Sequence, residues 1–115
     1  FQKKLSQIST IEKSQAEKVF QGEIKKSKIN SFTLDTALKK TKLDRLKIDL
    51  LDIDVEGADL KVLEGFSLEK FKPELICVEI HEKEIAKSEI FKYLNNYRYD
   101  LVWSGVFSHI FSSKA

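Results

Sequence analysis

Two short stretches of this sequence concentrate side chains that can move protons or bind cations. A neutral imidazole beside carboxylates can take a proton from a hydroxyl group near neutral pH. Mixed nitrogen and oxygen ligands also suit several divalent cations. The residue types therefore indicate either general-base catalysis or a metal site, and both remain open at this point. The candidate residues are Asp52, Asp54 and Glu56 in the first stretch and Glu79, His81 and Glu82 in the second.

Each candidate also has an ordinary structural explanation. Because side chains alternate along a strand, Asp52 and Asp54 share one face, and a carboxylate near apolar layers needs a partner such as a lysine, a backbone N–H or His81. The charge of Glu56 is explained by the dipole of a following helix alone. We expect Gly57 to form a tight turn that lets the backbone approach whatever fills the crevice.

The first stretch follows an apolar run that predicts a strand. Residues that are apolar at consecutive positions suit a central strand buried on both faces of a sheet. In open α/β sheets, functional residues lie at the carboxyl ends of such strands, where the loop leads into a helix. The apolar members are Leu50, Leu51, Ile53 and Val55.

The elements after Gly57 place the second stretch beside the first. Leu60 and Leu63 mark one face of a helix that ends near Gly65. The apolar run from Leu75 to His81 predicts another strand. A right-handed crossover sets the two strands parallel and adjacent, so their carboxyl ends meet.

The fold class expected from the whole pattern is α/β, with a partial doubly wound sheet in the order β-α-β-α-β-β after an irregular N-terminal third. The other expected elements are a helix within Ile8 to Gln21 stopped by Gly22, an edge strand within Glu23 to Thr33, a helix capped by Thr33 or Asp35 and ending at Lys40, a helix from Ser88 to Asn96, and a hairpin of Tyr99 to Trp103 and Val106 to Phe111.

The composition of the sequence limits the classes of partner that we expect. Lys and Arg number 20 against 18 Asp and Glu, with both signs interspersed, so we expect no nucleic-acid partner. No apolar stretch approaches the roughly 20 residues that span a bilayer, so we expect no membrane partner. Cys77, in an apolar run, is expected in the core and agrees with a reducing, cytoplasmic location. His109 is expected at the surface.

Three motifs together resemble the FkbM-type methyltransferases. They are Thr33-Leu34-Asp35, Ile53-Asp54-Val55-Glu56-Gly57 and Val78-Glu79-Ile80-His81. The resemblance implies a Rossmann-like enzyme that uses S-adenosylmethionine to methylate a hydroxyl of a sugar, glycan or polyketide-like acceptor. It also implies that Asp54, Glu56 and His81 are catalytic and that Glu79 and Gly57 bind the acceptor.

The family's glycine-rich cofactor loop has no counterpart in this sequence. The four glycines, at positions 22, 57, 65 and 105, are well separated. We therefore expect residues 1–115 to be a single domain, the carboxyl-terminal part of a methyltransferase domain, with the S-adenosylmethionine site largely outside it. A divalent metal is possible but has no support in the sequence.

Two other functions remain as alternatives. One is a non-catalytic binding or assembly module that keeps half of the fold. The other is a haloacid-dehalogenase-type phosphotransferase that uses Asp52 and Asp54. Without the cofactor half, the strand from Leu46 to Val55 becomes a sheet edge. We expect either a homodimer across that edge or a cap formed by Glu23 to Phe32.

Overall fold

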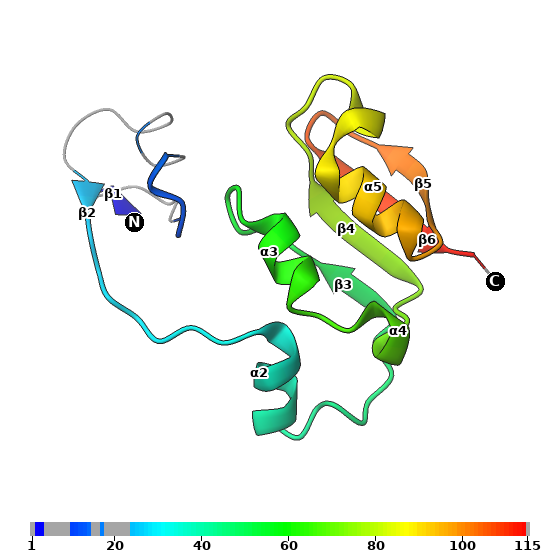
Figure 1. The fold of residues 1–115 in the computed structure, drawn as a ribbon, viewed down its shortest axis with the longest axis horizontal. Helices are drawn as coiled ribbons and strands as arrows, with labels where there is room; N and C mark the ends of the chain where they lie inside the picture. Colours follow the sequence, from blue (N-terminus) through cyan, green and yellow to red (C-terminus); the bar gives the residue numbers. More distant parts are fainter. Residues whose placement is uncertain (1, 4–9, 15–16, 18–23, 115) are drawn as a thin grey trace.

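The main part of the molecule is a four-stranded mixed sheet with helices packed on it (Figure 1). A computed structural model describes residues 2–3, 10–14, 17 and 24–114. The elements of the main part are α2 (Leu34–Lys40), β3 (Leu50–Asp52), α3 (Asp59–Glu64), α4 (Leu68–Phe71), β4 (Leu75–Glu79), η1 (Ile85–Lys87), α5 (Glu89–Asn96), β5 (Tyr99–Ser104) and β6 (Ser108–Ser113). The strand order is β3-β4-β6-β5, with β3 and β4 parallel and β6 antiparallel to both of its neighbours.

Apart from the additional short helices α4 and η1, the predicted succession of strands and helices along this part of the chain is confirmed, and so is the parallel pairing of the two acid-bearing strands. Local chemistry explains where the helices begin. The Thr33 side chain accepts a hydrogen bond from the N–H of Thr36 at the start of α2. Ser88 does the same for the N–H of Phe91 at the start of α5. Both are N-caps, which satisfy backbone donors that a helix leaves free.

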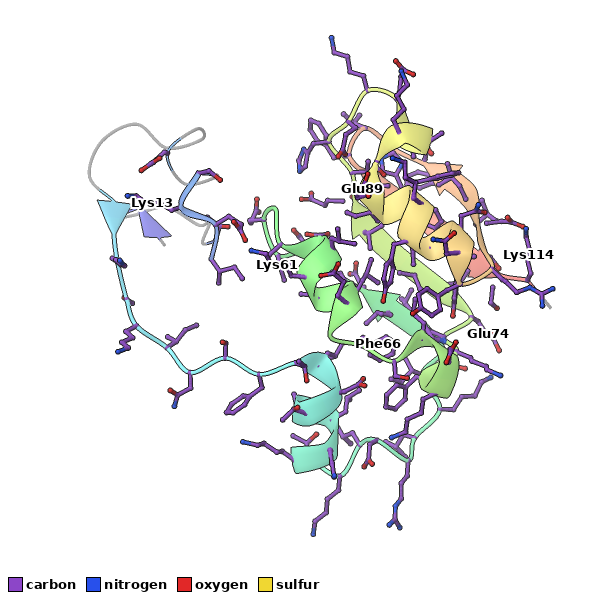
Figure 2. All side chains as sticks on the ribbon, viewed as in Figure 1. Lys13, Lys61, Phe66, Glu74, Glu89 and Lys114 are labelled. Atoms are coloured by element: carbon purple, nitrogen blue, oxygen red, sulfur yellow. The ribbon has the colours of Figure 1, made fainter. Side chains whose placement is uncertain are left out.

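The core lies between one face of the sheet and the helices α3 and α5. Figure 2 shows Phe66 where α3 leads into α4, and its ring stacks on Phe71 with centroids 4.9 Å apart. Successive residues of a strand point to opposite faces, so alternate positions of β4 enter this core. The buried apolar residues are Ile53, Leu63, Phe66, Leu68, Phe71, Ile76, Val78, Ile80, Leu94, Tyr99 and Phe111.

The prediction that the first strand is buried on both faces is wrong for the described structure, whereas the expectation that it forms a sheet edge in this chain is confirmed. β3 lies at the end of the sheet and pairs only with β4. Leu50 is 56% exposed, and its register partner Leu75 is also exposed. In the described part of the chain, the helices bury one face of the sheet and leave these side chains on the other. An apolar run shows which residues can be buried but not what covers them.

Two smaller predictions also need correction. His109 was expected at the surface, yet it is 2% exposed because β6 turns it toward the helix-covered face, in register with the buried Val78. Its Nε2 lies 3.3 Å from the carbonyl oxygen of Ile80. Cys77 was expected in the core, but it is only half-buried, because it shares the open face of the sheet with Leu50 and Leu75.

The N-terminal part contributes a second, two-stranded sheet. β1 (Gln2–Lys3) pairs antiparallel with β2 (Ile24–Lys25), and residues 26–33 form no regular element. β2 therefore does not cover the edge of β3, and the expected internal cap is wrong. The helix predicted within residues 8–21 falls mainly outside the described residues. None of the helices in the described ranges is long and apolar enough to cross a membrane.

Candidate active site

The loop between β3 and α3 holds an unusual backbone. Glu56 has φ 50° and Gly57 has φ 97°, so two successive residues are left-handed. Glycine adopts this conformation without strain. The left-handed backbone at Gly57 confirms the tight turn predicted there. For a residue with a side chain, it costs about 1–2 kcal/mol. Such strain is concentrated at functional sites, where it fixes a side chain in a required position.

A segment far away in the sequence holds this loop. Thr10 is buried, and its hydroxyl donates a hydrogen bond of 2.6 Å to the carbonyl oxygen of Glu56. The Thr10 hydroxyl oxygen also accepts a hydrogen bond from the N–H of Glu12, and the Glu12 carboxylate forms an ion pair with Lys61 of α3. These contacts connect residues 10–12 to the strained turn and to α3.

Asp59, the first residue of α3, is a site residue that the sequence did not reveal. It is only 2% exposed, and its Oδ2 accepts a hydrogen bond of 3.0 Å from the backbone N–H of Glu79. Burial raises the pKa of the Asp59 carboxyl above its ordinary value, against the effect of this hydrogen bond. The only signal in the sequence was an acid in the first turn of a predicted helix, which is usually a solvated position.

Glu79, at the end of β4, is the electrostatic centre of the site. Burial is the main cause that raises the pKa of its carboxyl, and the nearby charge of Asp54 adds to it. The Glu56 and Asp59 charges act in the same direction, whereas His81 acts in the opposite one. His81 Nε2 lies 3.5 Å from Glu79 Oε2. The acids that follow β3 are therefore close enough to Glu79 to raise the pKa of its carboxyl.

The β5–β6 hairpin supports His81 from the other side. The ring of His81 lies 4.8 Å from the ring of Phe107, centroid to centroid. The carbonyl oxygen of Phe107 accepts a hydrogen bond of 2.9 Å from the N–H of Ile80. Phe107 is half exposed and was not among the residues singled out in the sequence.

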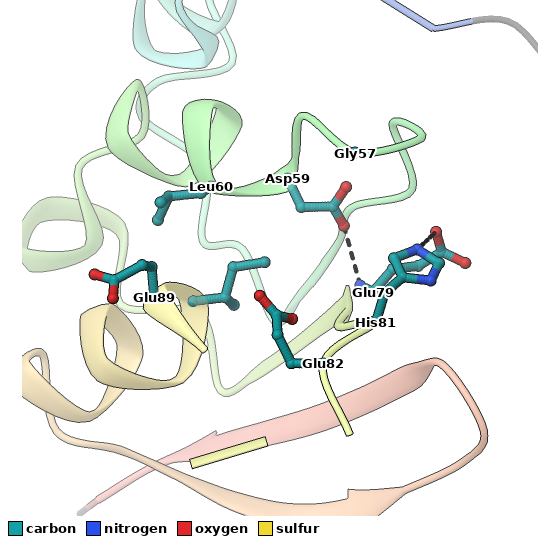
Figure 3. A pocket seen from close by; sticks show the side chains of 8 residues that line it. Gly57, Asp59, Leu60, Glu79, His81, Glu82 and Glu89 are labelled. Carbon is teal, nitrogen blue, oxygen red and sulfur yellow. Dashed lines mark hydrogen bonds and ion pairs between the residues drawn. The ribbon is translucent and has the colours of Figure 1, made fainter. Parts of the chain in front are cut away.

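A pocket of about 500 Å³ opens between α3, the end of β4 and the start of α5 (Figure 3). Among the described residues that line it there is no lysine or arginine, so this lining favours ligands that donate hydrogen bonds or carry positive charge. The lining residues are Gly57, Asp59, Leu60, Glu79, His81, Glu82, Glu89 and Ile90.

The structure separates the predicted candidates into three groups. Gly57, Glu79, His81 and Glu82 line the pocket. Asp54 and Glu56 act on Glu79 through their charges but do not line the pocket. Asp52 lies on the open face of the sheet beside Cys77, where burial and the Asp52 carboxylate raise the pKa of the thiol. Within the described ranges, no group of three or more His, Cys, Asp or Glu side chains could hold a metal ion.

The geometry suits proton transfer from a hydroxyl group. His81 is about half exposed, so a ligand can reach it, and Glu79 stands within 4 Å to stabilise a protonated ring. The remaining carboxylates can accept hydrogen bonds from further hydroxyl groups of the same ligand.

One of three comparisons with known proteins gives a match. Neither the curated proteins nor the solved structures give a match. The family model described as the methyltransferase FkbM domain matches residues 3–101, a range that contains both strand ends of the site. The chain therefore belongs to the FkbM methyltransferase family.

Proposed function

We propose that this chain forms the acceptor side of an S-adenosylmethionine-dependent O-methyltransferase with a Rossmann-like sheet. The acceptor is a hydroxyl of a sugar, glycan or polyketide-like molecule. The observation that carries the proposal is the His81–Glu79 pair, which lies in an acidic pocket where two parallel strands end, in a chain of a methyltransferase family.

The proposed roles follow from position and charge. His81 takes the proton of the acceptor hydroxyl on its imidazole, and Glu79 stabilises the imidazolium at 3.5 Å. Asp54 and Glu56 add negative charge near the Glu79 carboxyl at this end of the site. Gly57 lets the acceptor approach the backbone of the turn.

The described residues do not fit the adenosyl part of the cofactor. Gly57, Gly65 and Gly105 lie in separate loops and form no glycine-rich cradle within the described ranges. We therefore expect the isolated chain to bind S-adenosylmethionine no better than millimolar, which calorimetry measures. Micromolar binding would show that described residues build a cofactor site after all.

One observation favours a second candidate function, a binding or assembly module. The outer edge of β3 makes no strand pairing among the described residues, and Leu50 beside it is exposed. Such an edge is a ready template for another chain. The phosphotransferase alternative has less support, because Asp52 lies on the open face with Cys77 and is not among the residues that line the pocket with His81.

Methyl transfer from labelled S-adenosylmethionine to a panel of hydroxyl acceptors tests the proposal. The assay uses this chain, and also a complete methyltransferase domain that carries it. The His81→Ala variant should lower turnover roughly 10²- to 10⁴-fold, the usual effect of losing general-base catalysis, with little change in melting temperature. The Asp54→Asn variant should also lower turnover, because the Asp54 charge acts on Glu79. Glu84→Gln is the matched control, because Glu84 is an exposed acid of the same loop that forms an ion pair with Lys87 and does not line the pocket. Variants that keep their specific activity but melt several degrees lower would show that the acids are structural.

A further inference from the structure

We propose that Asp59 is the positioning residue of this site, because its buried carboxylate replaces a missing strand contact and holds Glu79 and His81 in place. The catalytic meaning of this inference rests on the proposed function. Its structural part is independent of that function: a side chain replaces a main-chain acceptor where two strands separate.

The pairing of β3 with β4 shows what is missing. The N–H of Leu75 donates to the carbonyl oxygen of Asp49 at 3.0 Å. In a regular parallel ladder the same relation repeats every two residues, so the N–H of Glu79 should donate to the carbonyl oxygen of Ile53. In the structure, the N–H of Glu79 instead donates a hydrogen bond of 3.0 Å to Asp59 Oδ2. The ladder therefore ends one step early.

The point of separation is sharp. The N–H of Ile53 still donates to the carbonyl oxygen of Cys77 at 2.9 Å, so β3 and β4 are paired up to this residue. Beyond it, β3 leaves for the strained turn at Glu56 and Gly57, while β4 continues to Glu79. Figure 3 shows the Asp59 carboxylate in the space between this turn and the end of β4.

Asp59 thus connects three parts of the site. It belongs to α3, its carboxylate binds the backbone of Glu79, and its own backbone follows the turn within two residues of Gly57. Since Glu79 lies 3.5 Å from His81, any movement of the Glu79 backbone changes the distance between the two groups that would share the acceptor proton. A displacement of about 1 Å at such a pair can cost roughly 100-fold in rate.

The burial of this carboxylate also argues against a purely stabilising role. Asp59 Oδ1 makes no hydrogen bond within the described residues, and burying an incompletely satisfied carboxylate is unfavourable. An apolar side chain would avoid that cost but would leave the N–H of Glu79 without an acceptor. The carboxylate is therefore explained by the geometry it imposes at the strand end.

The test uses nuclear magnetic resonance on the 115-residue chain. Asp59→Asn keeps an acceptor oxygen, Asp59→Leu removes it, and Glu64→Gln, an exposed acid on the same helix, is the matched control. Hydrogen exchange at the Glu79 amide should be roughly 10- to 100-fold faster in Asp59→Leu, as expected from losing a hydrogen bond to a charged acceptor. It should stay slow in Asp59→Asn and in Glu64→Gln. The Leu75 amide, which is held by Asp49, is the internal reference.

A second measurement does not depend on whether Asp59→Leu folds. A scalar coupling across the hydrogen bond, from the Glu79 amide nitrogen to the Asp59 carboxyl carbon, should be detectable in the unaltered chain. The Glu79 carboxyl of Asp59→Leu should also titrate closer to its ordinary pKa, because the released strand end is better solvated. No coupling, or equally slow Glu79 exchange in Asp59→Leu, would overturn the inference. Failure of the proposed function would be distinguishable from failure of this inference. In that case Asp59 would still protect the Glu79 amide from exchange, but the methyl-transfer assay would show no activity.

Discussion

Replacing Glu56 by glycine should separate function from stability. Glu56 has φ 50°, a conformation that costs about 1–2 kcal/mol for a residue with a side chain. Glycine removes that strain, but its greater conformational entropy stabilises the unfolded chain by about 0.4–1 kcal/mol. The Thr10 hydrogen bond is kept, because it goes to the backbone carbonyl oxygen of residue 56. The net result should be a gain of about 0–1.5 kcal/mol in the free energy of unfolding.

At about 4 °C per kcal/mol for a chain of this size, the melting temperature should rise by up to about 6 °C. Methyl transfer should fall strongly, because the Glu56 charge acts on Glu79. Lys42→Gly is the matched control, since Lys42 has φ 59° on an exposed turn and reports the backbone effect alone. Circular dichroism measures the melting and labelled methyl transfer measures the activity. If Lys42→Gly gains stability while Glu56→Gly melts several degrees lower, the Glu56 side chain holds the loop and our reasoning is wrong.

Three further predictions concern stability and assembly. The pKa values of Asp59 and Glu79 are raised in the folded state above their unfolded values of 3.8 and 4.5. The contribution of these two groups to the free energy of unfolding is therefore full below the unfolded values and is lost as the pH rises through the folded values. Asp59→Asn should flatten the resulting decline in melting temperature, measured from pH 3 to pH 8. Tyr99→Phe should lower the free energy of unfolding by about 1–3 kcal/mol in urea titrations, because the carbonyl oxygen of Pro73 loses its 2.8 Å hydrogen bond from the buried hydroxyl; an unchanged midpoint would show that water replaces it. Light scattering during size-exclusion chromatography should find a homodimer across the edge of β3 that Leu50→Lys weakens, and a monomer at all concentrations would contradict this.

Local patterns in the sequence were sufficient for the elements and their order. The N-caps Thr33 and Ser88 and the helix end at Gly65 depend on hydrogen bonds within a few residues, so their positions follow from the residue types alone. The parallel pairing of β3 and β4 follows from the handedness of the crossover. These rules also brought Glu79 and His81 to the same end of the sheet as the turn at Gly57.

Only the tertiary structure decided which of these residues are buried and which carboxylate binds the end of β4. The apolar Leu50 is exposed and the polar His109 is buried, because helices pack on only one face of the sheet in the described structure. The sequence emphasised Asp52 and Asp54, which are exposed, and not Asp59, which is buried against the end of β4. Burial depends on neighbours that are distant in the chain, and a side chain can replace a strand contact only where two strands separate in space. Sequence periodicity shows neither which distant residues become neighbours nor where two strands separate.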